Sequence, residues 1–111
     1  MNSIINEVEE LKELIINSTE FKEYKKYEEL LDTNSRVKEL VNKYTSIQKE
    51  IVLLESKNND TSDKEKELDL LYSELTSIDE YNKYLDSSKK LNELITNIQK
   101  NFQEFFDSLV S

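Results

Sequence analysis

The sequence of 111 residues contains no glycine and no proline. Glycine ends helices and permits tight turns, and proline breaks the helical hydrogen-bond ladder, so only polar caps remain to interrupt helices in this chain. Cysteine and histidine are absent as well. Their absence excludes disulfides, thiol or imidazole catalysis, and metal sites built from those ligands. The sequence therefore predicts an all-α protein that functions by binding other proteins.

Apolar residues recur at helical spacing along most of the chain, which predicts one domain over residues 1–111, a helical bundle of about five helices. Two helices are expected to be long, at about 35–57 and about 78–109. The second would be about 46 Å long, whereas a globule of this size has a radius of gyration of about 13 Å. Either the molecule is elongated or a partner covers the overhang. Serine and glutamate three residues apart predict capping boxes at the starts of two helices, formed by Ser62 with Glu65 and by Ser77 with Glu80.

The last predicted helix carries the clearest apolar stripe. Its members recur every three or four residues, with Ser88 between the second and the third, and share one helix face: Tyr81, Tyr84, Leu91, Ile95, Ile98, Phe102 and Phe105. Phe106 points about 100° away from Phe105, so one of the two is expected to meet a second surface. These eight residues are candidates for a core or for an interface, and the pattern fits both. Phe102→Asp is accordingly expected to abolish either folding or assembly.

The net charge is −9, from 15 basic and 24 acidic side chains. This balance argues against direct binding to nucleic acid and against adsorption to anionic lipid. The longest aliphatic run, Ile51 to Leu54, is too short to cross a membrane, so a cytoplasmic location is expected. The acidity is concentrated between Asp60 and Glu80, which is either a solvated connector or a patch that docks on a basic partner.

Enzymatic chemistry has few residues to draw on. A chain without glycine lacks the phosphate-binding loops, and one without histidine or cysteine lacks the usual catalytic pairs, so we expect no catalytic residue, no cofactor and no metal. Spaced acids such as Glu7, Glu10 and Glu13 are typical of a solvated helix face. An enzyme that uses carboxylates alone stays a distant alternative, which a stoichiometrically bound divalent metal would support.

Two five-residue segments share one pattern of glutamate, aromatic, polar, charged and tyrosine. They are Glu20-Phe21-Lys22-Glu23-Tyr24 and Glu80-Tyr81-Asn82-Lys83-Tyr84. Each follows a break rich in serine or threonine at a helix start. The repetition reflects either a duplication or a need for the same aromatic anchor at both places, and we favour the second interpretation.

The first of these segments precedes a capping Asp32 and a helix that carries Leu40, Tyr44 and Gln48 at intervals of four; Glu80 and Tyr81 open the final helix. Over nearly the whole chain these elements resemble the YlbF/YmcA family of small bacterial helical regulatory proteins. The resemblance implies a self-associating helical bundle within a complex of small regulators that modulates RNase Y, and hence mRNA processing, competence, sporulation and biofilm formation.

Two departures from the family pattern stand out. Relatives often carry glycine or proline in the connector and before the last helix, where this chain has neither. Some relatives are linked to iron–sulfur clusters through cysteines, and this chain could not ligate such a cluster alone.

The sequence and the resemblance together predict a non-catalytic regulatory or adaptor protein that acts by helix-mediated protein–protein interaction. Its expected assembly is a homo-oligomer, namely a dimer, or a hetero-oligomer with related small regulators, with a link to RNase Y. The alternative is a structural or chaperone-like coiled-coil protein without a role in RNA turnover, which would bind unfolded polypeptides broadly.

Overall fold

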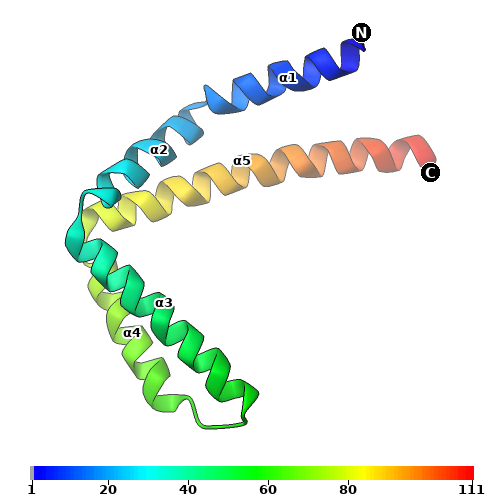
Figure 1. Cartoon of the computed structure of the whole chain (residues 1–111). Coiled ribbons are helices and arrows are strands. Elements are labelled where there is room, and N and C mark those ends of the chain that lie inside the picture. The colour runs from blue at the N-terminus through cyan, green and yellow to red at the C-terminus, as the bar shows by residue number, and fades with distance from the viewer. Residues whose placement is uncertain (1) are drawn as a thin grey trace.

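The computed structural model describes residues 2–111, and this part of the chain forms helices and no strand (Figure 1). The predicted all-α class is confirmed. The five helices in chain order are α1 (Ser3–Ile16), α2 (Thr19–Asp32), α3 (Ser35–Ser56), α4 (Ser62–Thr76) and α5 (Asp79–Val110). The two long helices predicted from the sequence therefore correspond to α3 and α5, with bounds that differ by one residue.

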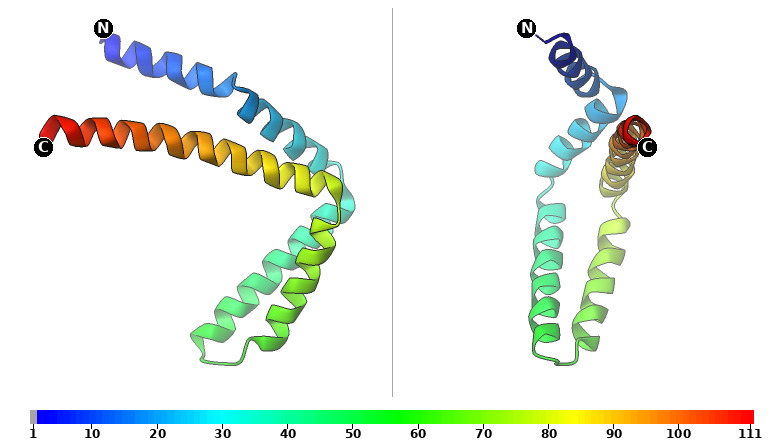
Figure 2. Two further views of the ribbon diagram at one scale, coloured as in Figure 1. Left: turned by 180° about the vertical axis from the view of Figure 1, so that it is seen from behind. Right: turned by 90° about the vertical axis from the view of Figure 1, so that its right-hand side faces the viewer.

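The helices form two arms that meet in a V, and within each arm the packed helices run antiparallel (Figures 1 and 2). The long arm consists of α5 with α2 packed along its first part, and α1 continues from α2 toward the same free end, where both termini lie. The short arm is the hairpin of α3 and α4. The radius of gyration is 19.7 Å and the molecule measures 56 × 37 × 22 Å, well beyond the value of about 13 Å for a globule of this length. The chain is thus elongated.

Polar caps start the first three helices in place of glycine and proline. Asn2, Ser18 and Asn34 each accept a hydrogen bond from a backbone N–H in the first turn of α1, α2 and α3, respectively. Both predicted capping boxes are wrong, because α4 and α5 begin without a side-chain cap at Thr61 and Ile78. The Ser77 hydroxyl instead donates to the Glu74 carbonyl at the end of α4.

Asn58 takes the position that glycine usually occupies after a helix. Its φ is 58°, in the left-handed region. The Asn58 N–H donates to the Glu55 carbonyl and the Asn59 N–H donates to the Leu54 carbonyl, which together close α3 as a Schellman motif. The reversal between α3 and α4 is therefore made by asparagine, one of the few other residues that tolerates this backbone conformation.

The core lies where the two arms join. Its buried apolar members within residues 2–111 are Leu31, Val37, Leu40 and Leu75. Partly buried side chains from α3, α4, α5 and the turn before α5 pack around them: Tyr44, Leu71, Ile78, Tyr81 and Tyr84. Because the core sits at the vertex, the free ends of both arms extend beyond it.

Candidate protein-interaction site

The apolar stripe of α5 is covered along only part of its length. From Tyr81 to Ile98 most stripe residues are half-buried, whereas every residue from 99 to 111 is exposed. The α2 helix, which begins just after α1, packs against the first part of α5, and no helix among residues 2–111 packs closely on the rest. About three turns at the end of the stripe are consequently bare in the single chain.

The N-terminal helix does not close this gap. Its apolar residues Ile4 and Val8 are exposed, while Leu11 and Ile15 are half-buried. An open groove runs between the two helices at their free ends, lined by Leu11 of α1 and by Ile98, Asn101, Phe102 and Phe105 of α5. Two apolar faces thus confront each other without filling the space between them.

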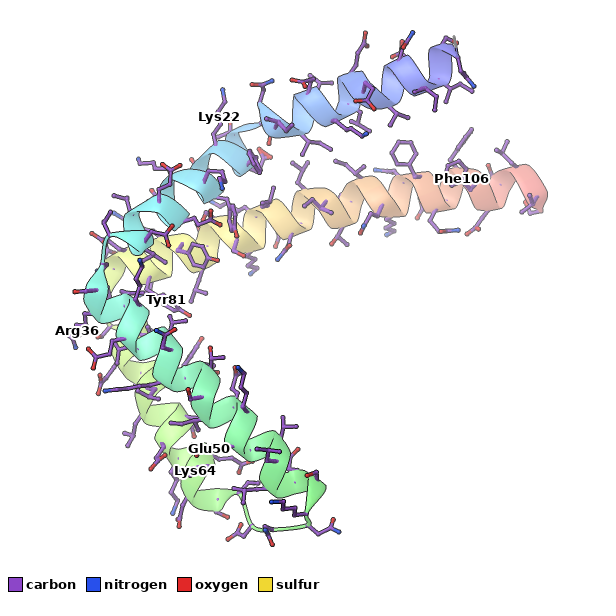
Figure 3. All side chains as sticks on the ribbon, viewed as in Figure 1. Lys22, Arg36, Glu50, Lys64, Tyr81 and Phe106 are labelled. Atoms are coloured by element: carbon purple, nitrogen blue, oxygen red, sulfur yellow. The ribbon has the colours of Figure 1, made fainter. Side chains whose placement is uncertain are left out.

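Three phenylalanines near the free end of α5 form an exposed aromatic cluster. The rings of Phe102 and Phe106 stack with centroids 6.1 Å apart, and those of Phe105 and Phe106 lie 5.8 Å apart. Phe102 is 44% exposed and Phe105 is 55% exposed. Phe106 lies at the free end of the long arm (Figure 3). The structure therefore places these three predicted site residues outside the core of the single chain, unlike Tyr81 and Tyr84, which pack against it.

The remaining motif residues distribute over the vertex and the short arm. Leu40 is buried in the core and Tyr44 packs against it, whereas Gln48 is exposed on α3. The Asn34 side chain donates a hydrogen bond of 3.3 Å to Glu80, which ties the start of α3 to the start of α5. These residues join elements at the vertex, apart from Gln48.

Tyr24 of α2 and Tyr84 of α5 connect the two repeated motifs. Their ring centroids are 5.6 Å apart, and the Tyr84 ring also lies 6.3 Å from that of Tyr81. Phe21, in the first turn of α2, is half-buried, and so is Glu20. The structure thus brings the aromatic residues of both motifs to one contact between α2 and α5.

A charged network surrounds Tyr24. The Tyr84 hydroxyl first, and the Glu28 carboxylate second, raise the pKa of Tyr24 above its ordinary value. A hydrogen bond of 2.8 Å from Lys25 lowers the pKa of Glu28, and the same contact raises the pKa of Lys25. Each shift reinforces the form present at neutral pH, so none of the three is poised to exchange a proton there. Of these contacts only the one between Tyr24 and Tyr84 joins α2 to α5, and the network is unsuited to acid–base catalysis.

Two further features bear on what the molecule can bind. Across residues 2–111, no group of three or more acidic side chains converges in a way that could hold a metal ion. In the same part of the chain, every helix is too short or too polar to cross a membrane.

One surface was not predicted from the sequence, a groove along the short arm between α3 and α4. Its floor is formed by Ile47, Leu70 and Leu71. The periodic pattern accounts for Ile47 and Leu71, which face the partner helix. Leu70 is the extra leucine beside this stripe, and such an additional apolar position was the available signal for a second surface.

The chain matches a known protein family. The sequence model of the family described as "Control of competence regulator ComK, YlbF/YmcA" matches residues 4–105, nearly the whole chain. A search of curated proteins finds no match.

Proposed function

The chain belongs to the YlbF/YmcA family, and from this premise we propose that it is a non-catalytic regulatory protein that binds other proteins through exposed helix faces. The observation that carries the proposal is the bare apolar groove at the free end of the long arm, between α1 and the last turns of α5. Aromatic side chains such as Phe102 and Phe105 are favoured at the centres of protein interfaces.

The exposed area of the chain supports assembly. The chain exposes 8569 Å², whereas a folded monomer of 13.2 kDa exposes about 6,400 Å². The excess is about a third of the expected value. Obligate interfaces bury about 2,000 Å² or more in total and are rich in apolar side chains. About half of that area, 1,000 Å² or more, lies on each partner, so the excess of this chain is large enough for the interface of a homo-oligomer or of a hetero-oligomer with related small regulators.

The regulatory setting is proposed from the family. Its description names control of the competence regulator ComK. We extend the resemblance to a complex that modulates RNase Y and mRNA processing, in which this chain contributes helix faces. With no cysteine in its sequence, it would supply no ligand to an iron–sulfur cluster.

Substitution in the groove tests the assembly. Phe102→Asp and Phe105→Asp place a charge among apolar groups of α5 without touching the buried core. We expect both variants to keep the helical circular dichroism of the parent and to lose its oligomeric mass in light scattering. Thr96→Asp, at an exposed position of α5 outside this groove, is the matched control and should assemble normally. Variants that stay fully assembled would overturn the assignment of this surface.

A tagged pull-down from the native cytoplasm tests the regulatory setting. Recovery of related small regulators together with RNase Y, lost in the Phe102→Asp variant, is the expected result. Recovery of the chain alone would remove RNase Y from the proposal and leave a self-associating helical protein.

A chaperone-like protein is the second candidate function. The observation that favours it is the open apolar groove between two diverging helices, which could hold an unfolded segment. Such a protein would suppress the aggregation of several unrelated unfolded proteins. A regulator with few partners would not.

A further inference from the structure

The groove on the short arm is separate from the long-arm groove and differs from it in chemistry. It runs between α3 and α4, over a floor made by Ile47, Leu70 and Leu71. Leu70 is 68% exposed although its neighbour Leu71 packs against the core. A hairpin of two helices cannot enclose both of its edges, so this leucine remains in contact with water.

The two sides of this groove carry net charges of opposite sign. Lys38, Glu39 and Lys43 line it on α3, and Glu67 and Glu74 line it on α4. Lys43 pairs with Glu39 of its own helix, at 3.2 Å and well exposed.

The charges on the two sides do not neutralise each other across the groove. The ion pair that joins α3 to α4 within residues 2–111 is Lys64 with Glu50, at 2.9 Å near the tip of the hairpin and outside the groove (Figure 3). Glu67 contacts Lys64 of its own helix at 3.5 Å. Within the groove, Lys43 and Glu67 are thus paired on their own helices, whereas Lys38 on α3 and Glu74 on α4 have no ion-pair partner among residues 2–111 and remain available to an occupant.

We propose that this groove binds an amphipathic helix of a different protein. Its apolar stripe would cover Leu70, its acidic flank would lie along Lys38, and its basic flank along Glu74. The groove extends along α3 from Ser35 to Ile47, about 18 Å, which matches a helix of about 12 residues. The inference rests on the proposed protein-binding function and specifies the chemistry of one partner.

The two grooves differ in the chemistry of their lining, which indicates two different kinds of partner. The long-arm groove is lined by apolar side chains and one amide, as in permanent interfaces, which are the more hydrophobic class. The short-arm groove has charged rims, and charge complementarity across an interface favours fast, selective and salt-sensitive association. Since the grooves lie on different arms, one molecule can use both at once, as an adaptor requires.

Designed helical peptides provide the test, with binding measured by fluorescence anisotropy on the full chain. Three peptides of about 14 residues share one leucine stripe and differ in their flanks: one acidic and one basic flank, two acidic flanks, or two basic flanks. We expect the mixed peptide to bind most tightly and to weaken as salt is added. Leu70→Asp should weaken its binding by about tenfold or more.

A change in which peptide binds most tightly tests the role of the charged residues on the two sides of the groove. Glu67→Lys with Glu74→Lys makes both sides of the groove basic, so this variant should prefer the peptide with two acidic flanks. Glu65→Lys with Asp69→Lys makes the same charge change on α4 outside the groove and should leave the preference for the mixed peptide intact. An unchanged preference in the first variant, or no binding of any peptide to the parent chain, overturns the proposal.

Two readouts separate this inference from the proposed function. Light scattering of Leu70→Asp should give the parent's oligomeric mass; a loss of mass with unchanged peptide affinity would mean that a second copy occupies the groove, which also overturns the proposal. A Phe102→Asp variant that still assembles would contradict the assignment of the long-arm groove. If the same variant still binds the mixed peptide, the short-arm site is supported nonetheless.

Discussion

Tyr24 and Tyr84 lie 60 positions apart in the sequence, and their rings meet with centroids 5.6 Å apart between α2 and α5. Each tyrosine is the last residue of one of the two repeated motifs. The motifs therefore meet each other in the fold. This contact gives a physical reason for the repeated pattern, since both helices supply an aromatic anchor to the same junction.

The tyrosine contact should be measurable as a coupling energy. Tyr24→Ala and Tyr84→Ala are each expected to destabilise the chain, and the double variant should be less unstable than the sum predicts, by about 0.5–1.5 kcal/mol. Urea unfolding of the parent, both single variants and the double variant gives this value. Strict additivity would show that the rings are neighbours without a stabilising interaction.

Two leucines of α4 should differ in their contribution to stability. Leu75 is buried at 1% exposure, so Leu75→Ala should lower the free energy of unfolding by about 2–5 kcal/mol. Leu70 is largely exposed, so Leu70→Ala should change it by less than about 0.5 kcal/mol. Thermal or urea unfolding at one protein concentration compares them. Similar losses for both leucines would contradict the assignment of the core to the vertex.

Asn58 offers a test of backbone strain. At its φ of 58°, Asn58→Gly should stabilise the hairpin slightly, because glycine adopts the left-handed region without a penalty from Cβ. Asn58→Ala should destabilise it by about 1 kcal/mol, because alanine tolerates this region poorly. The ranking Gly, Asn, Ala in melting temperature is the expected result. Alanine as stable as glycine would argue against the Schellman closure of α3.

The Lys25–Glu28 pair predicts an acid-sensitive part of the stability. The pKa of Glu28 is lowered in the fold, chiefly by Lys25, so its contribution is present above the unfolded pKa of about 4.3 and is lost as pH falls through the lower folded value. We expect the stability of Glu28→Gln to fall less steeply than that of the parent between about pH 5 and pH 3. If the stabilities of the two proteins fell in parallel over this pH range, the Lys25–Glu28 pair would make no such contribution.

The helices were predictable because nothing in the sequence competes with them. Without glycine or proline, the apolar period and the polar stretches between the stripes give the helix bounds, and those predicted for α3 and α5 differ from the structure by one residue. The caps were not predictable to the same degree. Ser77 has the right chemistry to cap α5, but its hydroxyl bonds to the last turn of α4, and a local pattern does not say which of two competing backbone groups a serine will satisfy.

The placement of the arms lies beyond what periodicity contains. A stripe such as Leu91 to Phe105 indicates which face of a helix is apolar, but not which surface covers it. The structure shows that α2 covers its beginning and leaves its end bare. For the same reason the sequence predicted Phe102 and Phe105 as core or interface, and only the fold places them outside the core of the single chain. Whether a partner covers them stays a prediction.

The small core at the vertex has a mechanical consequence. A few side chains, Leu75 and Val37 the most deeply buried among them, set the angle between two stiff arms. The α5 helix alone has 32 residues and is about 48 Å long, so a rotation of about 5° at the vertex moves its far end by about 4 Å. A small change of the angle at the hydrophobic core is thus amplified along the length of α5. A substitution that only repacks the core can therefore displace the free end of α5 by more than the length of a hydrogen bond.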